Sequence, residues 1–212
     1  GDASLWHLQP RVADMKAHVK KAYKDQLDGV VGIHWRTEEI RLNFKTFSHF
    51  ASNPDSDKSI QAIYRDFFSE EYGRYAAEEL APPLAAADTS GLLNGISSPV
   101  YFAYTPSWGR LNERQSTACK KWIHTIDACM ERADDQEKVK NLQWLKGNLE
   151  FTLLLDEVGR KLEPAWKIRE RVLSCSRMEN REEQVKDAVE QLRNAPVEEL
   201  IAAFASKVRS RG

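Results

Sequence analysis

The sequence predicts a mainly α-helical protein with one short β-strand near its start. Apolar residues recur at three- and four-residue spacing through most of the 212-residue chain, as on one face of an amphipathic helix. Residues 28–36 break this pattern: they read DGVVGIHWR, with a continuous apolar run instead of an alternating one. Such a run is typical of a parallel strand that is buried on both faces.

The first helix is expected over residues 10–26, because Pro10 suits the first helical position and apolar residues then recur on one face. Asp28 and Gly29 end this helix, and the strand is expected over residues 30–35. The apolar face of the helix is formed by Val12, Met15, Val19 and Ala22.

A second helix is expected from Thr37 to about Ser52, since Thr37 can cap it and acidic residues follow in its first turn. The predicted buried face consists of Ile40, Phe44, Phe47 and Ala51. The strand between the two helices needs neighbouring strands for its backbone hydrogen bonds. No later segment is a convincing partner, so these strands are expected in sequence before Gly1. The chain, which begins without a methionine, is interpreted as a fragment or a processed product.

Two helices are expected between residues 58 and 87. The first ends at Tyr72 and Gly73, and the second should kink or restart at Pro82 and Pro83. The buried stripe of the first helix contains Ile60, Ile63, Tyr64, Phe67 and Phe68.

Residues 90–111 form a predicted loop that is rich in glycine, proline, serine and aromatic residues. Long structured loops are often functional, but this one could equally be held in place by its own aromatic side chains. The chain beyond Asn112 is expected to be helical, with a central helix that continues or restarts at Pro164. We therefore predict two domains, residues 1–88 and residues 89–212.

Composition excludes several classes of function. The 31 basic and 32 acidic residues give a net charge of -1, which argues against nucleic-acid binding. No apolar run approaches the ~20 residues of a membrane-spanning helix. The three cysteines lack CxxC spacing and the five histidines lack metal-ligand spacing, so buried free thiols and no metal are expected. The GVVG stretch lacks the pattern of a phosphate loop, and no cofactor is predicted.

The candidate binding residues lie where the predicted strand ends. His34, Trp35 and Arg36 occupy its carboxyl end, where parallel α/β proteins bind ligands. Trp35 offers a flat apolar face to a sugar ring, and Arg36 offers several hydrogen-bond donors to hydroxyls or a carboxylate. The alternative is that Trp35 packs in the core and Arg36 pairs with a nearby carboxylate.

Three stretches resemble a known class of enzyme. GIHWRT, EEIRLNFKTFSHFASNP and IYRDFFSEEYGRYAAEEL resemble the end of the catalytic barrel in glycoside hydrolases of the TIM-barrel type. The later stretch LQWLKGNLEFTLLLDEVGRKLEPAWKIRERVL is similar to the C-terminal helical domains of hexosaminidase-like and α-glucuronidase-like enzymes. This resemblance implies the last unit of a (β/α)8 barrel, followed by an α-helical bundle that braces it.

The same resemblance implies a role in sugar binding. Trp35 would line the subsite nearest the scissile bond, His34 or Arg36 would contact the sugar, and Tyr104 and Trp108 of the loop would form a second wall. No carboxylate pair occupies a strand end, so the catalytic residues are expected in preceding sequence and this chain alone should be inactive. The implied partners are an oligosaccharide or polysaccharide and the N-terminal barrel portion of the same protein.

Two other hypotheses remain open. The chain could be a non-enzymatic helical interaction module, in which residues 30–35 form a buried helical turn or an edge strand. It could also be a small-molecule enzyme whose site includes Asp156 and Glu157 in the helical bundle. Free cysteines are typical of intracellular proteins, whereas polysaccharide hydrolases are often exported, so the sequence assigns no compartment.

Overall fold

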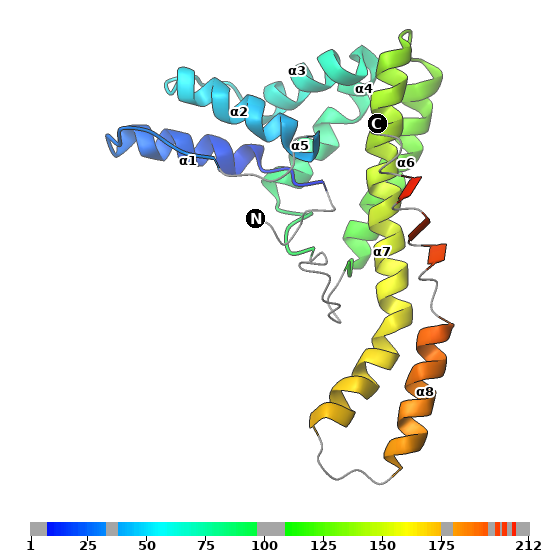
Figure 1. The fold of residues 1–212 in the computed structure, drawn as a ribbon. Helices are drawn as coiled ribbons and strands as arrows, with labels where there is room; N and C mark the ends of the chain where they lie inside the picture. Colours follow the sequence, from blue (N-terminus) through cyan, green and yellow to red (C-terminus); the bar gives the residue numbers. More distant parts are fainter. Residues whose placement is uncertain are drawn as a thin grey trace.

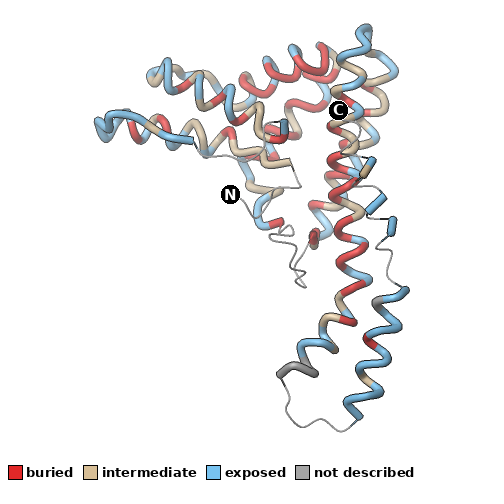
Figure 2. Tube along the Cα trace, in the orientation of Figure 1, coloured by how far each residue is buried: buried red, intermediate tan, exposed pale blue. Residues whose placement is uncertain are grey.

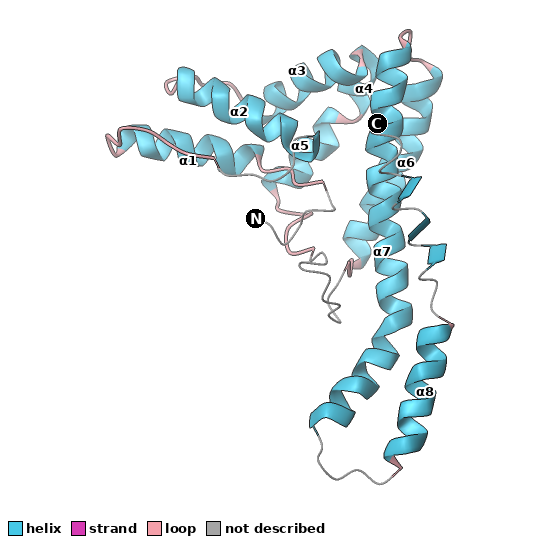
Figure 3. Ribbon diagram, in the orientation of Figure 1, coloured by secondary structure: helices cyan, strands magenta, loops and turns pink. Residues whose placement is uncertain are grey.

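The protein is mainly α-helical, as predicted. The computed structural model describes residues 8–32, 38–96, 109–174 and 180–194, together with 198–199, 201–202 and 205–206. Within these ranges the regular structure is helical, with one short 3₁₀ turn, and no strand is present (Figure 3). None of the helices in this part of the chain is long and apolar enough to cross a membrane. The elements are α1 (Val12–Lys24), η2 (Glu38–Ile40), α2 (Arg41–Ser52), α3 (Ile60–Tyr72), α4 (Arg74–Glu79), α5 (Ala81–Thr89), α6 (Glu113–Glu131), α7 (Gln136–Ser174) and α8 (Arg181–Arg193).

The predicted barrel unit is not supported. The described part of the predicted strand, Val30–Gly32, has no regular secondary structure, and Val31 is 88% exposed. The rest of that strand, from Ile33 to Trp35, lies outside the described residues. A strand needs neighbours for its backbone hydrogen bonds, and no other described segment supplies a strand to pair with it.

Helices α1 and α2 lie side by side and project from the rest of the molecule (Figure 1). The side chain of Asn43 in α2 fastens this pair to the segment before α1. Its amide group donates a hydrogen bond to the carbonyl of Gln9 at 2.6 Å and accepts one from the backbone N–H of Arg11 at 2.9 Å.

The predicted buried face of α2 is wrong in part. Phe44 is 38% exposed and Ala51 is exposed, whereas Thr46 and Phe50 are completely buried. The hydroxyl of Thr46 is satisfied inside its own helix, because it donates to the carbonyl of Leu42 at 2.8 Å. Contact with α1 therefore selects a different face from the one that the phenylalanine spacing favours.

Helices α3, α4 and α5 follow one another through sharp breaks. The break predicted at Tyr72 and Gly73 is confirmed, and Gly73 has a φ of 92°, a backbone conformation that favours glycine. The second predicted helix is divided at Leu80 into α4 and α5. Pro82 and Pro83 lie in the first turn of α5, where a missing backbone N–H costs no intrahelical hydrogen bond.

The C-terminal half is dominated by α7, which has 39 residues and is therefore about 58 Å long. Helix α7 continues through Pro164, which decides between the two predicted alternatives. Helices α6 and α8 pack along α7, and α3 also contacts it (Figure 1). Asn112 and Gln115 form a capping box at the start of α6, with two reciprocal hydrogen bonds of 2.9 Å.

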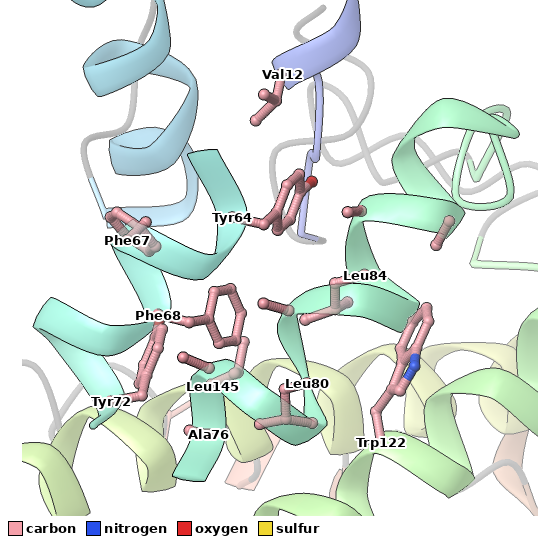
Figure 4. Packing of buried hydrophobic residues seen from close by; sticks show 14 of the residues in the cluster. Val12, Tyr64, Phe67, Phe68, Tyr72, Ala76, Leu80, Leu84, Trp122 and Leu145 are labelled. Atoms are coloured by element: carbon pink, nitrogen blue, oxygen red, sulfur yellow. The ribbon is translucent and has the colours of Figure 1, made fainter. Parts of the chain in front are cut away.

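The largest core lies where α3, α5, α6 and α7 meet. Tyr64, Phe68 and Tyr72 of α3 form a column of aromatic rings, with the Phe68 and Tyr72 ring centroids 4.8 Å apart (Figure 4). Leu80, between α4 and α5, and Trp122 of α6 close this core (Figure 4). Buried residues continue along α7, whereas most of α8 is exposed (Figure 2). The domain boundary between residues 88 and 89 stays a prediction.

Candidate functional site

A pocket of about 210 Å³ lies where the start of α2, the end of α3 and the first turns of α7 meet. We call it the α2–α3–α7 pocket. The short turn η2 and helix α2 contribute charged side chains, while α3 and α7 contribute both aromatic and polar side chains. It is lined by Glu38, Arg41, Phe67, Glu71, Tyr72, Lys140, Asn141 and Trp144.

The polar side of this pocket is organised around Glu71. Its carboxylate accepts a hydrogen bond of 2.7 Å from the guanidinium of Arg41, and the ammonium of Lys45 lies 3.4 Å from the same oxygen. The Glu71 side chain is only 9% exposed. Glu38 approaches Arg41 more loosely, at 3.6 Å. The Glu71 carboxylate thus pairs with two cationic side chains, which suits a binding or structural role.

The apolar side of the pocket is aromatic. Phe67 and Tyr72 lie edge to face, with ring centroids 6.1 Å apart and an interplanar angle of 70°. Burial, followed by the charge of Glu71, raises the pKa of the Tyr72 phenol, so its hydroxyl stays protonated at neutral pH. The ammonium of Lys45 lies 5.3 Å from the centre of the Phe67 ring, within range of a cation–π contact.

The amide of Asn141 joins α7 to the end of α3. Its Nδ2 group donates a hydrogen bond of 3.0 Å to the backbone carbonyl of Glu71, one of the carbonyls that a helix end leaves without an intrahelical partner. A smaller cavity of about 60 Å³ adjoins the pocket and shares Phe67, Tyr72 and Trp144 with it. The two spaces together give this junction an aromatic wall with polar groups along one edge.

A second constellation fastens the end of the aromatic loop to α7. The backbone N–H of Leu111 donates to Asp156 at 2.9 Å, and Arg160 donates both to Asp156 at 3.0 Å and to the carbonyl of Leu111 at 2.7 Å. Arg110 also pairs with Glu163. Asp156 is thus a mostly buried member of an ion pair, and it positions the chain directly after Trp108 and Gly109.

All five residues that the sequence predicts as sugar ligands lie outside the described residues: His34, Trp35, Arg36, Tyr104 and Trp108. Their role stays a prediction. The chain places one group of them close in sequence to the pocket, because only Thr37 separates Arg36 from Glu38. Similarly, Trp108 directly precedes Gly109 at the anchored end of the loop.

Sequence reasoning did not find the α2–α3–α7 pocket. From the sequence alone, the adjacent acidic residues Glu70 and Glu71 are typical of a solvated helix face, but Glu71 is buried beneath Arg41 and Lys45. The break at Gly73 was the available signal, because it marks a helix end where α7 can approach. Nothing in the local spacing identifies α7 as that neighbour.

Other chemistry is limited in the part of the chain that the structure describes. That part contains no group of three or more residues that could hold a metal ion. Cys119 and Cys129 are buried free thiols, as predicted, and burial raises the pKa of each to about 11. Cys175 lies outside the described residues.

Comparison with known proteins adds no relative. No family model matches the chain, and neither the curated proteins nor the solved structures contain a match.

Proposed function

We propose that this chain is the C-terminal portion of a carbohydrate-active enzyme of the glycoside hydrolase type, and that it supplies sugar binding and a helical brace. The observation that carries the proposal is the α2–α3–α7 pocket, whose first lining residue, Glu38, follows His34, Trp35 and Arg36 after a single intervening residue. The residues that resemble a sugar subsite thus directly precede, in the sequence, a residue that lines a pocket with aromatic walls and charged edges.

The chemistry of the pocket suits a polyhydroxylated ring. Aromatic side chains such as Phe67 and Trp144 contact the apolar face of a sugar, while arginine, asparagine and carboxylate groups bind its hydroxyls. A glycoside hydrolase uses two carboxylates that flank the scissile bond. Glu71 is occupied by Arg41 and Lys45, so in this proposal the acid and base come from the barrel portion and this chain orients the substrate.

Exposed apolar residues around α1 and α2 support the proposal that another portion of the same protein covers this surface. Val31 is 88% exposed, Leu27 is 60% exposed and Tyr23 is 55% exposed, all within the end of α1 and the segment after it. Phe44 on the neighbouring helix α2 is exposed although its spacing favours burial. Exposed apolar residues are usually scattered singly over a protein surface, whereas these are close together in the sequence or on neighbouring helices. In this proposal, the barrel portion covers them.

Tryptophan fluorescence during titration with a panel of neutral oligosaccharides tests the proposal. Sugar binding should change the emission, and Trp35→Ala and Trp108→Ala should each reduce that change. Trp166→Ala is the matched control, because Trp166 lies on the distant half of α7 beside Arg169. A response of unchanged size in both variants, or no response to any oligosaccharide, would contradict the proposal.

A non-enzymatic helical interaction module is the second candidate, and α8 favours it. Val185 and Val189 are 41% and 40% exposed on α8, while Ala188 is buried in the same stretch. These valines could hold a further helix against the α7–α8 pair. Light scattering over a range of concentrations tests this for self-association: a mass increase that Val185→Lys removes supports the module, and a constant monomer mass contradicts self-association.

A further inference from the structure

We infer that the α2–α3–α7 pocket is a subsite for one neutral sugar ring. This inference rests on the proposed carbohydrate function and adds to it a position and a charge class for the ligand. The residues involved are separate from the five predicted sugar ligands, so the pocket would be a contact of its own along an oligosaccharide.

The size of the pocket limits the ligand. Its volume of about 210 Å³ lies below the ~300–1,000 Å³ of sites for drug-sized molecules. One sugar ring is compatible with this space, whereas a nucleotide or a flavin is not. The remainder of an oligosaccharide would extend into solvent from the open side of the pocket.

The charges in the pocket balance and leave both a donor and an acceptor available. Glu38 and Glu71 oppose Arg41 and Lys140, and Glu71 is already held by Arg41 at 2.7 Å. Lys140 is exposed and has no ion pair among the described residues. Glu38 lies 3.6 Å from Arg41, beyond a good hydrogen bond. A sugar hydroxyl both donates and accepts, so it suits this pair of groups.

A charged ligand fits this arrangement less well. A carboxylate beside Lys140 would also lie in the same small pocket as Glu38 and Glu71, and an ammonium beside Glu38 would also lie in the same pocket as Arg41 and Lys140. Like charges at short range disfavour binding in either case. A purely apolar ligand would instead remove water from the Arg41–Glu71 ion pair without replacing its hydrogen bonds.

The aromatic wall explains why the ligand should be a ring with an apolar face. Phe67, Tyr72 and Trp144 line the same pocket from α3 and α7. The C–H groups on one face of a pyranose can pack against such side chains while its hydroxyls reach Lys140 and Glu38 at the polar edge.

The experiment records the indole N–H resonances of the six tryptophans during titration with methyl β-glucopyranoside, glucuronate or glucosamine. Trp144→Phe assigns the resonance that belongs to the pocket. Saturable movement of that resonance with methyl β-glucopyranoside is the expected result, and glucuronate and glucosamine should each bind at least about five-fold more weakly. Lys140→Ala should weaken binding at least about ten-fold, as for the loss of one hydrogen bond to a charged group.

Lys120→Ala is the matched control, because it removes an exposed lysine from α6 and should leave binding unchanged. Sugar-dependent shifts at Trp35 or Trp108 without a shift at Trp144 would overturn this inference and leave the proposed function standing. No shift at any indole, with longer oligosaccharides also tested, would overturn both. Tighter binding of glucuronate or glucosamine than of the neutral sugar would overturn the charge class that we infer.

Discussion

Removal of the Asp88 carboxylate should destabilise the fold more when Tyr64 is present than when it is replaced by phenylalanine. Asp88 on α5 accepts hydrogen bonds from the Tyr64 hydroxyl at 2.9 Å and from the backbone N–H groups of Val12 at 2.8 Å and Ala13 at 3.4 Å. Asp88 therefore caps the start of α1 although it lies on another helix. It also provides the hydrogen-bond acceptor for the hydroxyl of Tyr64, a residue that is only 2% exposed.

The expected free energies follow from these contacts. Loss of a helix cap costs about 1 kcal/mol. A buried hydroxyl without a partner costs about 1–3 kcal/mol more, so Asp88→Ala should lower the free energy of unfolding by about 3 kcal/mol. Tyr64→Phe alone should cost about 1 kcal/mol. In the Tyr64→Phe background no hydroxyl is left without a partner, so Asp88→Ala should then cost only about 1–2 kcal/mol.

Urea unfolding, followed by far-ultraviolet circular dichroism, measures all four proteins of this double-mutant cycle. A coupling energy of about 1–2 kcal/mol is expected between the two sites. Asp14→Ala serves as the control, because Asp14 forms an exposed ion pair with Arg11 and should cost less than about 1 kcal/mol. Additive effects of Asp88→Ala and Tyr64→Phe, with no coupling, would refute the reasoning.

Three further predictions concern the same fold. Burial raises the pKa of Asp88 despite the hydrogen bonds that lower it. Because its pKa is raised, Asp88 binds a proton more tightly in the folded state than in the unfolded state. The difference in unfolding free energy between the wild type and Asp88→Asn should therefore fall as the pH rises above about 4, the usual pKa of an aspartate. A rise over that range in paired urea titrations would contradict this sign. Gly109→Ala should lower the melting temperature more than Gly95→Ala. Both glycines have positive φ, of 68° and 78°, but only at Gly109 would the new Cβ meet α7, at 2.8 Å. Equal losses in thermal melts would count against a close approach there. Cys119 and Cys129 should be alkylated at mildly alkaline pH far more slowly in the folded protein than in denaturant, because burial raises both pKa values to about 11. Mass spectrometry of tryptic peptides checks this, and fast labelling of either residue in the folded protein would show that the helix bundle opens readily.

Two contacts at the site show why sequence reasoning stopped short of it. Glu71 and Arg41 are 30 positions apart, and Asn141 is 70 positions from Glu71. Each of these side chains is of a polar type that is mostly exposed in proteins, so the sequence alone gives no sign of its burial or contact. Their meeting depends on the directions in which α2, α3 and α7 leave their breaks, and apolar spacing does not encode those directions.

The sequence by itself determined the helices of this protein. The stripe of Ile63, Tyr64, Phe67 and Phe68 and the break at Gly73 both follow from residues within a few positions of one another, whereas the sequence left open whether α7 continues through Pro164. Helix formation depends on such local spacing and caps, so these predictions are confirmed.

Tertiary structure alone decided which faces and charges are covered. It turned Thr46 and Phe50 inward in place of Phe44, capped α1 with Asp88 from α5, and buried Glu71 between α2 and α7. The predicted strand also depends on tertiary structure, because a strand forms only by hydrogen bonding to a neighbouring strand. Residues 30–32 have no strand to pair with among the described residues. A helix satisfies its backbone within itself, whereas a strand, a buried charge and a binding pocket each need a partner from elsewhere in the fold.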